Sequence, residues 1–278
     1  MKTLAIVGTG LIGASLGLAV RKAGFAGPIL GVSSPAALGD AVEAGAIDRG
    51  VPLAEAAAAA DLVFLAQPIG RILDTIRHLN PLVRADALIT DAGSTKCQIA
   101  DLALQEITRC QFLGGHPMAG KEQHGARAAD ADLFQGCTWV LTPEEAAAMK
   151  TEQAADLITW IRRVGGHPLI LDPEEHDRVV SYTSHLAQMA STALASTVAE
   201  NLAADRLTVA GPGLRDMTRL ALSSYELWRD ILATNSESID QALGRYIQKL
   251  EYLRDNLRTR QLEEEFRNAA SLAGKVRK

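Results

Sequence analysis

Residues 4 to 13 read Leu-Ala-Ile-Val-Gly-Thr-Gly-Leu-Ile-Gly, an apolar run followed by three glycines in the spacing Gly-x-Gly-x-x-Gly. The run is short and ends in glycine, as buried parallel strands do, and a helical pattern from Leu11 to Ala23 follows it. In such a turn the first glycine allows the bend, the second lets the backbone approach a pyrophosphate, and the third lets helix and strand pack closely. The segment therefore predicts a dinucleotide-binding turn at the free N-terminus of a helix, formed by Gly8, Thr9, Gly10, Leu11, Ile12 and Gly13.

Strand-like and helical stretches alternate through the first 171 residues. This alternation predicts an α/β N-terminal domain with a doubly wound parallel sheet of the Rossmann type. The expected strands are Leu4–Val7, Ile29–Val32, Leu62–Ala66, Ala87–Thr90, Phe112–Leu113, Thr138–Leu141 and Pro168–Leu171, and the expected helices are Leu11–Ala23, Pro52–Ala60 and Ile69–Asn80.

The alternation stops at Asp172, where Asp-Pro-Glu-Glu predicts a helix start with an N-cap residue, proline at the first helical position and acids in the first turn. Most of the remaining sequence is helical in pattern, and residues 210–213 form its main break. We therefore expect two domains, a dinucleotide-binding domain at 1–171 and an all-α domain at 172–278.

A regular apolar stripe runs along the last part of the chain, at Ile239, Leu243, Tyr246, Leu250, Leu253 and Leu257. The steps of four and three residues are those of an a/d stripe of about three heptads. Two interpretations stay open: an amphipathic helix packed in its own domain, or a helix that packs against another subunit.

Composition excludes several classes of protein. Hydrophobic residues make up 47% of the 278 residues and charged residues 22%, which is globular composition. The net charge of −5 lacks the basic surplus of most nucleic-acid-binding proteins, and no apolar run is long enough to span a membrane. The three cysteines have no zinc-site spacing, so we expect no metal and a reducing compartment. Together these features predict a soluble, cytoplasmic protein without nucleic-acid or membrane partners.

The end of the second expected strand bears on the choice between NAD and NADP. An acid there usually binds the ribose 2′-hydroxyl of NAD and repels the 2′-phosphate of NADP. Here Ser33 and Ser34 follow the strand, no acid occurs before Asp40, and no basic residue is near in the sequence. The pattern favours NADP mildly and leaves NAD open. We also expect cofactor contacts from Gln67 and Pro68, which follow the strand at 62–66.

Polar residues gather in three segments where a hydrophobic core would exclude them. Residues 91–96 follow an expected strand, at the sheet edge where open α/β sheets bind ligands. Residues 114–125 also follow a strand and hold His116 between glycines and a proline, in what we expect to be a loop. Residues 211–219 carry Arg215 and Arg219, which share a helix face; we expect Arg215 to be a solvated or structural charge.

These segments resemble the prephenate/arogenate dehydrogenase family of tyrosine biosynthesis. The similarity extends from residue 1 to about 260 and implies a Rossmann domain, an all-helical dimerisation domain and a site in the cleft between them. Some members carry a C-terminal regulatory ACT domain, for which this chain has no room. The matching motifs are Gly-Gly-His-Pro-Met-Ala-Gly at 114–120 with residues 128–134, Ser94 and Lys96, Ser-His-Leu at 184–186, Asp216-x-x-Arg219, and Leu-Trp-Arg-Asp at 227–230.

The resemblance implies oxidative decarboxylation of prephenate, arogenate or both, with hydride transfer to NAD(P)+, giving 4-hydroxyphenylpyruvate or tyrosine. It implies that His116 takes the substrate hydroxyl proton, as a neutral imidazole can near pH 7. Ser94 would bond to that hydroxyl or to the imidazole, and Arg219 would hold the ring carboxylate bidentately. His185 would make a second substrate contact, and Lys96 would add positive potential for a dianionic substrate. A homodimer through the helical domain is implied as well.

Glu122 lies in the same segment as His116 and could pair with the ammonium group of arogenate, which prephenate lacks. It could instead be a surface acid or pair with Lys121 or Arg127. His124 stands where the family has a small residue, and its role stays open.

Other interpretations of these residues remain. Ser94 could be only a helix N-cap, and His185 could be only a buried histidine with its hydrogen bonds satisfied. We expect His78, His167 and His176 to lie outside the chemistry. One rival function is a dehydrogenase of the β-hydroxyacid type, which would need a catalytic lysine in the helical domain, where this chain offers only Lys249, Lys275 and Lys278. The other is a regulator that binds the dinucleotide without chemistry.

Overall fold

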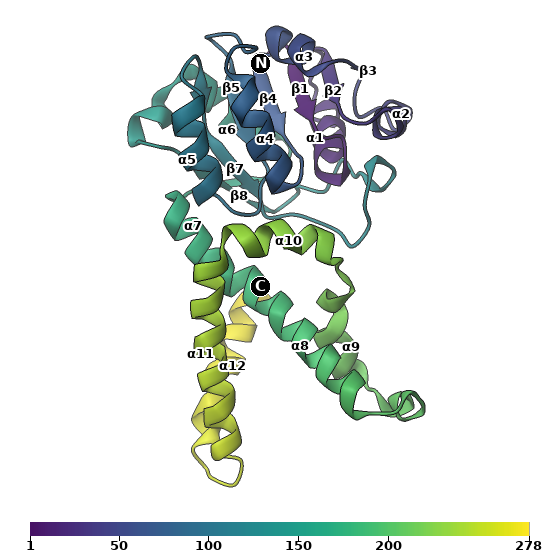
Figure 1. Cartoon of the computed structure of the whole chain (residues 1–278), viewed down its shortest axis with the longest axis vertical. Coiled ribbons are helices and arrows are strands. Elements are labelled where there is room, and N and C mark those ends of the chain that lie inside the picture. The colour runs from purple at the N-terminus through teal and green to yellow at the C-terminus, as the bar shows by residue number, and fades with distance from the viewer. Residues whose placement is uncertain (278) are drawn as a thin grey trace.

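The computed structural model describes residues 1–277 and consists of a sheet domain and a helical domain (Figure 1). The six strands of the main sheet are all parallel, in the order β3-β2-β1-β4-β5-β6, which is the strand order of dinucleotide-binding folds. The predicted Rossmann-type sheet is therefore confirmed. The strands are β1 Leu4–Val7, β2 Ile29–Val32, β3 Arg49–Gly50, β4 Leu62–Leu65, β5 Leu88–Asp91 and β6 Gln111–Phe112.

Helices cover both faces of this sheet, so its strands are buried on both sides. Leu4 and Ile6 of β1 face one core with α1, while Ala5 and Val7 face a second core with α3, α4 and α5. Two-sided burial explains why β1 reads as an unbroken apolar run. The helices of this domain are α1 Leu11–Lys22, α2 Pro35–Glu43, α3 Leu53–Ala59, α4 Ile69–Leu79, α5 Cys97–Glu106 and α6 Glu152–Arg163, of which α2, α5 and α6 were not predicted.

A second, three-stranded sheet holds the segment around His116. Strand β7 (Gly114–Pro117) pairs antiparallel with β8 (Thr138–Thr142), which pairs parallel with β9 (His167–Ile170). The expected loop at His116 is thus wrong: the residue lies on a strand. A Cβ on Gly115 would come within 2.7 Å of the Asp91 carbonyl oxygen, so the close packing needs glycine, a residue that disfavours strands in sequence-based prediction.

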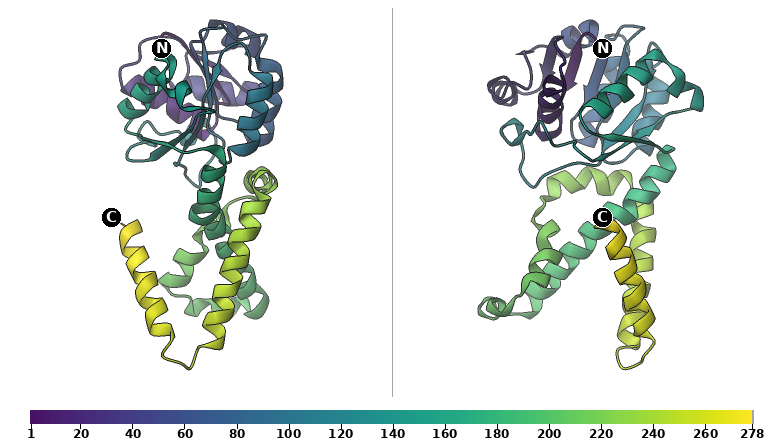
Figure 2. Two further views of the ribbon diagram at one scale, coloured as in Figure 1. Left: turned by 90° about the vertical axis from the view of Figure 1, so that its left-hand side faces the viewer. Right: turned by 180° about the vertical axis from the view of Figure 1, so that it is seen from behind.

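The helical domain begins as its sequence predicts, because Asp172 caps α7 (Pro173–Val180) by accepting from the Glu175 amide at 2.7 Å. A π-helical turn at Ser181–His185 joins α7 to α8. Figure 2 shows α11 and α12 as two antiparallel arms extending away from the sheet domain. The further helices are α8 Leu186–Asn201, α9 Pro212–Thr218, α10 Tyr225–Thr234, α11 Ser236–Asp255 and α12 Leu262–Val276, with 3-10 turns at Ala126–Ala128, Ala146–Lys150, Ala204–Val209 and Arg219–Leu222.

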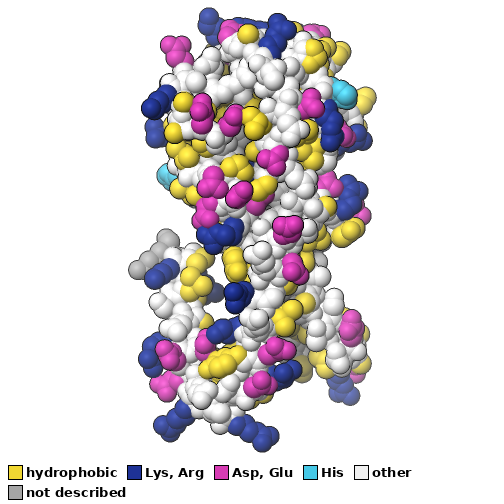
Figure 3. Space-filling view, turned by 60° about the vertical axis from the view of Figure 1, so that its left-hand side comes forward, with side chains coloured by type: hydrophobic (Ala, Val, Ile, Leu, Met, Phe, Trp, Pro, Cys, Tyr) yellow, Lys and Arg dark blue, Asp and Glu magenta, His cyan; other side chains and the backbone are white. Residues whose placement is uncertain are grey.

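The apolar stripe of α11 is buried at one end only. Ile239 is buried in the chain's own domain, whereas Leu250 is half exposed, and Leu257, in the turn just after α11, is 72% exposed. Helix α12 adds Phe266 and Leu272, which are also largely exposed, and hydrophobic side chains show on the surface of this arm among charged ones (Figure 3). No helix within residues 1–277 is long and apolar enough to cross a membrane.

Polar contacts fix the helical domain against the sheet domain. Asp230 of α10 accepts from the amide of Gly70 at the start of α4 at 2.9 Å, and the hydroxyls of Thr95 and Thr234 lie 2.7 Å apart. These contacts place α10 beneath the carboxyl edge of the main sheet (Figure 1). These hydrogen bonds therefore hold the two domains on either side of a cleft.

Candidate active site

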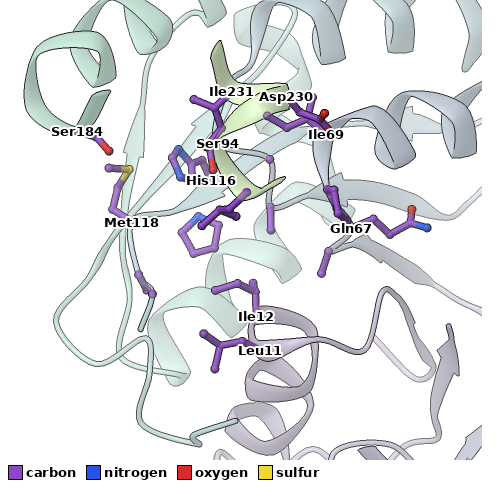
Figure 4. A pocket seen from close by; sticks show the side chains of 18 of the residues that line it. Leu11, Ile12, Gln67, Ile69, Ser94, His116, Met118, Ser184, Asp230 and Ile231 are labelled. Carbon is purple, nitrogen blue, oxygen red and sulfur yellow. The ribbon is translucent and has the colours of Figure 1, made fainter. Parts of the chain in front are cut away.

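The cleft is a cavity of about 470 Å³ between the carboxyl ends of the strands and α10. Parallel α/β sheets bind ligands at this edge. Side chains from the glycine turn, from both sheets and from the helical domain face the same space (Figure 4). Those that the sequence singled out are Leu11, Ile12, Gln67, Pro68, Ser94, His116, His124 and His185, and Met118, Trp228 and Ile231 lie with them.

The glycine turn has the geometry that a pyrophosphate needs. Gly8 has a φ of +97°, which other residues rarely adopt, and a Cβ on Gly13 would lie 2.0 Å from the Gly8 carbonyl oxygen. A Cβ on Gly10 would point into open space, and no side chain caps the helix that starts at Leu11. The backbone amides at this helix end are thus free to bind phosphate, and the turn fits a dinucleotide.

Several other predicted cofactor residues form hydrogen bonds with residues of the protein itself. The hydroxyl of Thr9 is turned inward and donates to the carbonyl of Ala37 at 3.2 Å. Ser34 caps α2 by accepting from the Ala37 amide at 3.4 Å, while Ser33 is exposed. Gln67 lines the cleft and accepts from another side chain, the hydroxyl of Thr75, at 2.8 Å. Of the two serines, Ser34 is thus engaged as a helix cap, whereas the exposed Ser33 is not.

His116 faces the cleft through only one of its ring nitrogens. Its Nδ1 lies 2.9 Å from Nε2 of His176, so its Nε2 is the nitrogen left for a ligand. Burial lowers the pKa of His116 well below 6.5, and the nearby His176, Lys96 and His185 lower it further. The imidazole is therefore neutral at pH 7, the form that a general base requires.

A buried ion pair holds the strand that carries His116. Lys96 Nζ and the Asp91 carboxylate are both fully buried and bonded to each other. Lys96 Nζ donates to the Gly115 carbonyl at 2.8 Å, and Asp91 accepts from the Gly115 amide at 3.0 Å. The pair thus fixes both backbone groups of the residue before His116.

This position corrects the expectation for Lys96. We expected its charge to act on the substrate, but the amine does not line the cleft and its charge is balanced by Asp91. Burial lowers the pKa of Lys96, an effect that Asp91 opposes. Lys96 therefore binds the backbone beside His116 and does not face the cleft.

His176, which was expected to lie outside the chemistry, is in hydrogen-bond contact with His116. Its ring is fully buried between His116 and the next residue, Asp177, whose Oδ1 lies 2.7 Å from His176 Nδ1. Asp177 also caps α5 by accepting from the amides of Lys96 and Cys97 at 2.7 and 3.0 Å. One carboxylate thus joins the two domains directly behind His116.

Ser94 and His185 both reach the cleft, from opposite domains (Figure 4 for Ser94). Ser94 is not a helix cap, because α5 starts only at Cys97 and its first amides donate to Asp177 instead. His185 is buried, with Nδ1 3.3 Å from Asn235 Nδ2 and its ring edge-on to Trp228 at 5.7 Å. Burial lowers the pKa of His185 to about 4, so it is neutral at pH 7.

Arg219 and Glu122, two predicted substrate ligands, bind each other at 2.7 Å. Both side chains are more than half exposed, and neither lines the cavity itself. The partners considered for Glu122 are occupied elsewhere, since Lys121 pairs with Asp130 at 2.6 Å. Arg215 is exposed and donates only to a backbone carbonyl, in line with a structural charge.

A polar contact of the missed residues can be inferred once their burial on α7 is known. His176 and Val180 are four residues apart and share one helix face, which is buried. A histidine and an aspartate among buried positions need hydrogen-bond partners, because unpaired buried polar groups are costly. Adjacent His176 and Asp177 at such positions therefore indicate a polar contact across the domains.

Two family models cover most of the chain. Residues 16–170 match the nucleotide-binding domain of prephenate dehydrogenase, and residues 172–270 match its dimerization domain. The chain belongs to the prephenate dehydrogenase family. A prephenate dehydrogenase of Lactococcus lactis is 36% identical over 246 residues, which are 85% of this chain and 66% of that protein. The chain thus spans about two thirds of the length of that relative.

Solved structures of the family share the whole architecture. The prephenate dehydrogenase of Aquifex aeolicus, in complex with hydroxyphenyl propionate and NAD+, has a TM-score of 0.87 and 28% identity, covering 100% of this chain and 97% of its own. An arogenate dehydrogenase of Synechocystis has a TM-score of 0.80 and 32% identity, covering 98% of each chain. The family of this chain is thus established, while its members act on more than one substrate.

Proposed function

We propose that this member of the prephenate dehydrogenase family catalyses the oxidative decarboxylation of prephenate or arogenate. The nicotinamide dinucleotide, when bound, accepts the hydride from the ring carbon that carries the substrate hydroxyl. His116 takes the proton from that hydroxyl, and Ser94 bonds to the same oxygen or to the imidazole. The ring carboxylate leaves as carbon dioxide, the ring becomes aromatic, and the proton returns to the phenolic oxygen.

One observation carries this proposal: a neutral, cleft-facing His116 shares one cavity with the free helix end at Gly10. A regulator that only senses dinucleotide needs no such base. A dehydrogenase of the β-hydroxyacid type would need a lysine facing the cavity from the helical domain, and no lysine of α7–α12 lines it within the described residues. Among residues 1–277, Lys121 of the sheet domain is the one lysine that lines it.

Steady-state assays with prephenate and arogenate, each with NAD+ and NADP+, test this function. We expect absorbance at 340 nm to rise for at least one combination, because reduced nicotinamide forms in every turnover. Dinucleotide binding without turnover in all four combinations would favour the regulator. The same four rates would decide the substrate and the cofactor.

We propose that the substrate ring carboxylate replaces Glu122 as the partner of Arg219. Arg219→Ala should then lower kcat/KM roughly ten- to a hundredfold, since a hydrogen bond to a charged group is worth about 1.5–3 kcal/mol. Arg219→Lys should rescue little, because an ammonium cannot reproduce the bidentate fork. Glu122→Gln is the matched variant: a loss confined to arogenate would indicate that Glu122 reads the ammonium group. Full activity of Arg219→Lys would exclude the carboxylate clamp.

We propose that Ser33 lies beside the ribose 2′ position of the cofactor. Ser33→Asp should raise the ratio of kcat/KM for NAD+ over NADP+, because a carboxylate accepts from the 2′-hydroxyl and repels a 2′-phosphate. Arg127 reaches α2, the helix that follows Ser33, but is already bonded to Asp40 of that helix at 2.9 Å. An unchanged ratio would mean that Ser33 does not face the ribose.

We also propose a homodimer through the helical domain. Leu250 of α11 and Phe266 of α12 expose apolar surface, and both lie within residues 172–270, which match the family's dimerization domain. Burying such side chains in a partner interface is favourable, at about 25 cal/mol per Å². Sedimentation velocity at micromolar concentration should give the mass of two chains. A single monomer peak would contradict this assembly.

A further inference from the structure

Three side chains joined by hydrogen bonds lead from the cleft into the protein, and the two behind His116 are buried. His116 Nδ1 is 2.9 Å from His176 Nε2, and His176 Nδ1 is 2.7 Å from Asp177 Oδ1. His176 and Asp177 are 0% and 2% exposed, so no bulk water competes for these bonds. The contacts run from the cleft, through α7, to the capped end of α5.

The donors and acceptors of these three side chains determine which ring nitrogens carry protons. Burial by itself would raise the pKa of Asp177, but hydrogen bonds from His176 and from the amides of Cys97 and Lys96 outweigh it and keep the carboxyl ionised. A carboxylate only accepts, so His176 carries a proton on Nδ1, and the tautomer that this bond selects has its lone pair on Nε2. His116 must then donate from its Nδ1, and its Nε2 is left without a proton, facing the cleft.

We infer that His176 and Asp177 hold His116 in this tautomer and that His176 takes up a proton during turnover. As the substrate O–H bond breaks, the Nε2–H bond of His116 forms. The Nδ1–H bond of His116 then breaks and the Nε2–H bond of His176 forms, so that the positive charge rests on His176 beside Asp177. The reverse shift returns the proton to the phenolic oxygen. The turnover step rests on the proposed function, whereas the tautomer does not.

The surroundings favour a charge on His176 over one on His116. His176 has an ionised carboxylate as direct partner, while Lys96 and His185 are the other titratable groups near His116, and neither is an anion. Asp91, the nearest further carboxylate, is already neutralised by Lys96. A positioning residue that shares the charge therefore lowers the cost of proton transfer in a buried site.

Two substitutions of His176 distinguish its two proposed roles, which are to hold the tautomer of His116 and to take up the proton. The amide oxygen of His176→Gln can accept from His116 Nδ1–H, since a glutamine amide reaches about as far as the imidazole Nε2, but it cannot take the proton. His176→Asn is shorter and leaves that N–H without a partner. His167→Gln, at an exposed histidine of β9, is the matched control.

Nitrogen NMR of ¹⁵N-histidine-labelled, unliganded protein reads the tautomer directly, with the His116 signals identified by their loss in His116→Asn. We expect a protonated Nδ1 and a bare Nε2 in the wild type and in His176→Gln, and a shift toward the Nε2–H form in His176→Asn. A wild-type His116 with its proton on Nε2 would overturn the inference, whether or not the enzyme acts on prephenate.

Kinetics of the same variants test the uptake of the proton. We expect kcat to fall roughly ten- to a hundredfold in His176→Gln and further in His176→Asn, the range found when a partner that orients a functional imidazole is removed. The KM for the dinucleotide and the unfolding midpoint should stay close to those of His167→Gln. Wild-type kcat in His176→Gln would overturn the uptake step and leave His176 with the tautomer alone.

Discussion

Replacing His116 by asparagine should lower kcat by roughly 10²–10⁴-fold, the span assigned to a positioned general base. Asparagine can still donate a hydrogen bond to His176 or to the substrate, but it cannot accept a proton. Dinucleotide affinity should change little, because the glycine turn is a separate element and does not contact the His116 side chain. Rapid-mixing kinetics and dinucleotide titration, measured on the same preparation, check both expectations.

The pH profile of the wild type adds a second readout for His116. Because burial holds the pKa of this imidazole well below 6.5, the base form persists below that pH, and kcat/KM should fall only as the pH passes through the lowered pKa. His167→Asn, at an exposed histidine, should leave rate and profile unchanged. An active His116→Asn enzyme would remove this residue from the mechanism.

Replacing Lys96 by methionine should destabilise the protein by about 3–5 kcal/mol, because a buried carboxylate is left without its counter-charge. Methionine keeps most of the volume of the side chain, so the loss reports the charge and not a cavity. Domains of this kind are stable by only about 5–15 kcal/mol, so the change should be large in urea unfolding. The strand that carries His116 should loosen as well, since Gly115 loses a partner for its carbonyl.

Lys22→Met is the matched control for this experiment. Lys22 pairs with Asp132 at 2.6 Å, but both side chains are more than half exposed, and such surface pairs are worth about 0–1 kcal/mol. The two variants therefore remove the same charge from a buried and from an exposed ion pair. Equal losses of stability in both would show that the Asp91–Lys96 pair does not hold the site together.

Local sequence pattern was enough to predict five of the six strands of the main sheet, all but the short edge strand β3. The run at Leu4–Val7 and the glycines after it specify a strand, a turn and a helix, because two-sided burial and close backbone approach leave few alternatives. The cap at Asp172 is equally local and is confirmed by its bond to the Glu175 amide. Helix α2 was missed although Ser34 and Pro35 form a regular helix start, since its short, alanine-rich sequence shows little apolar periodicity.

The candidate site could be predicted only in part, because much of it depends on contacts between distant residues. His116 stood out for its glycine and proline neighbours, but nothing near it in the sequence indicates that His176, 60 residues later, lies against its ring. The charge on Lys96 suggested a role toward an anionic substrate, and only the fold reveals that Asp91 takes it. A sequence shows which residues are charged, but the tertiary structure determines which charged residues pair with one another.

The stoichiometry of a single reaction mixture tests the proposed oxidative decarboxylation most directly. Wild-type enzyme, its preferred dinucleotide and its preferred substrate are incubated to completion, and reduced dinucleotide, carbon dioxide and aromatic product are each quantified. We predict one reduced dinucleotide and one carbon dioxide for each 4-hydroxyphenylpyruvate or tyrosine formed, with no product above background when His116→Asn replaces the wild type over the same period. Reduced dinucleotide without carbon dioxide, or aromatic product without reduced dinucleotide, would contradict oxidative decarboxylation in this cleft.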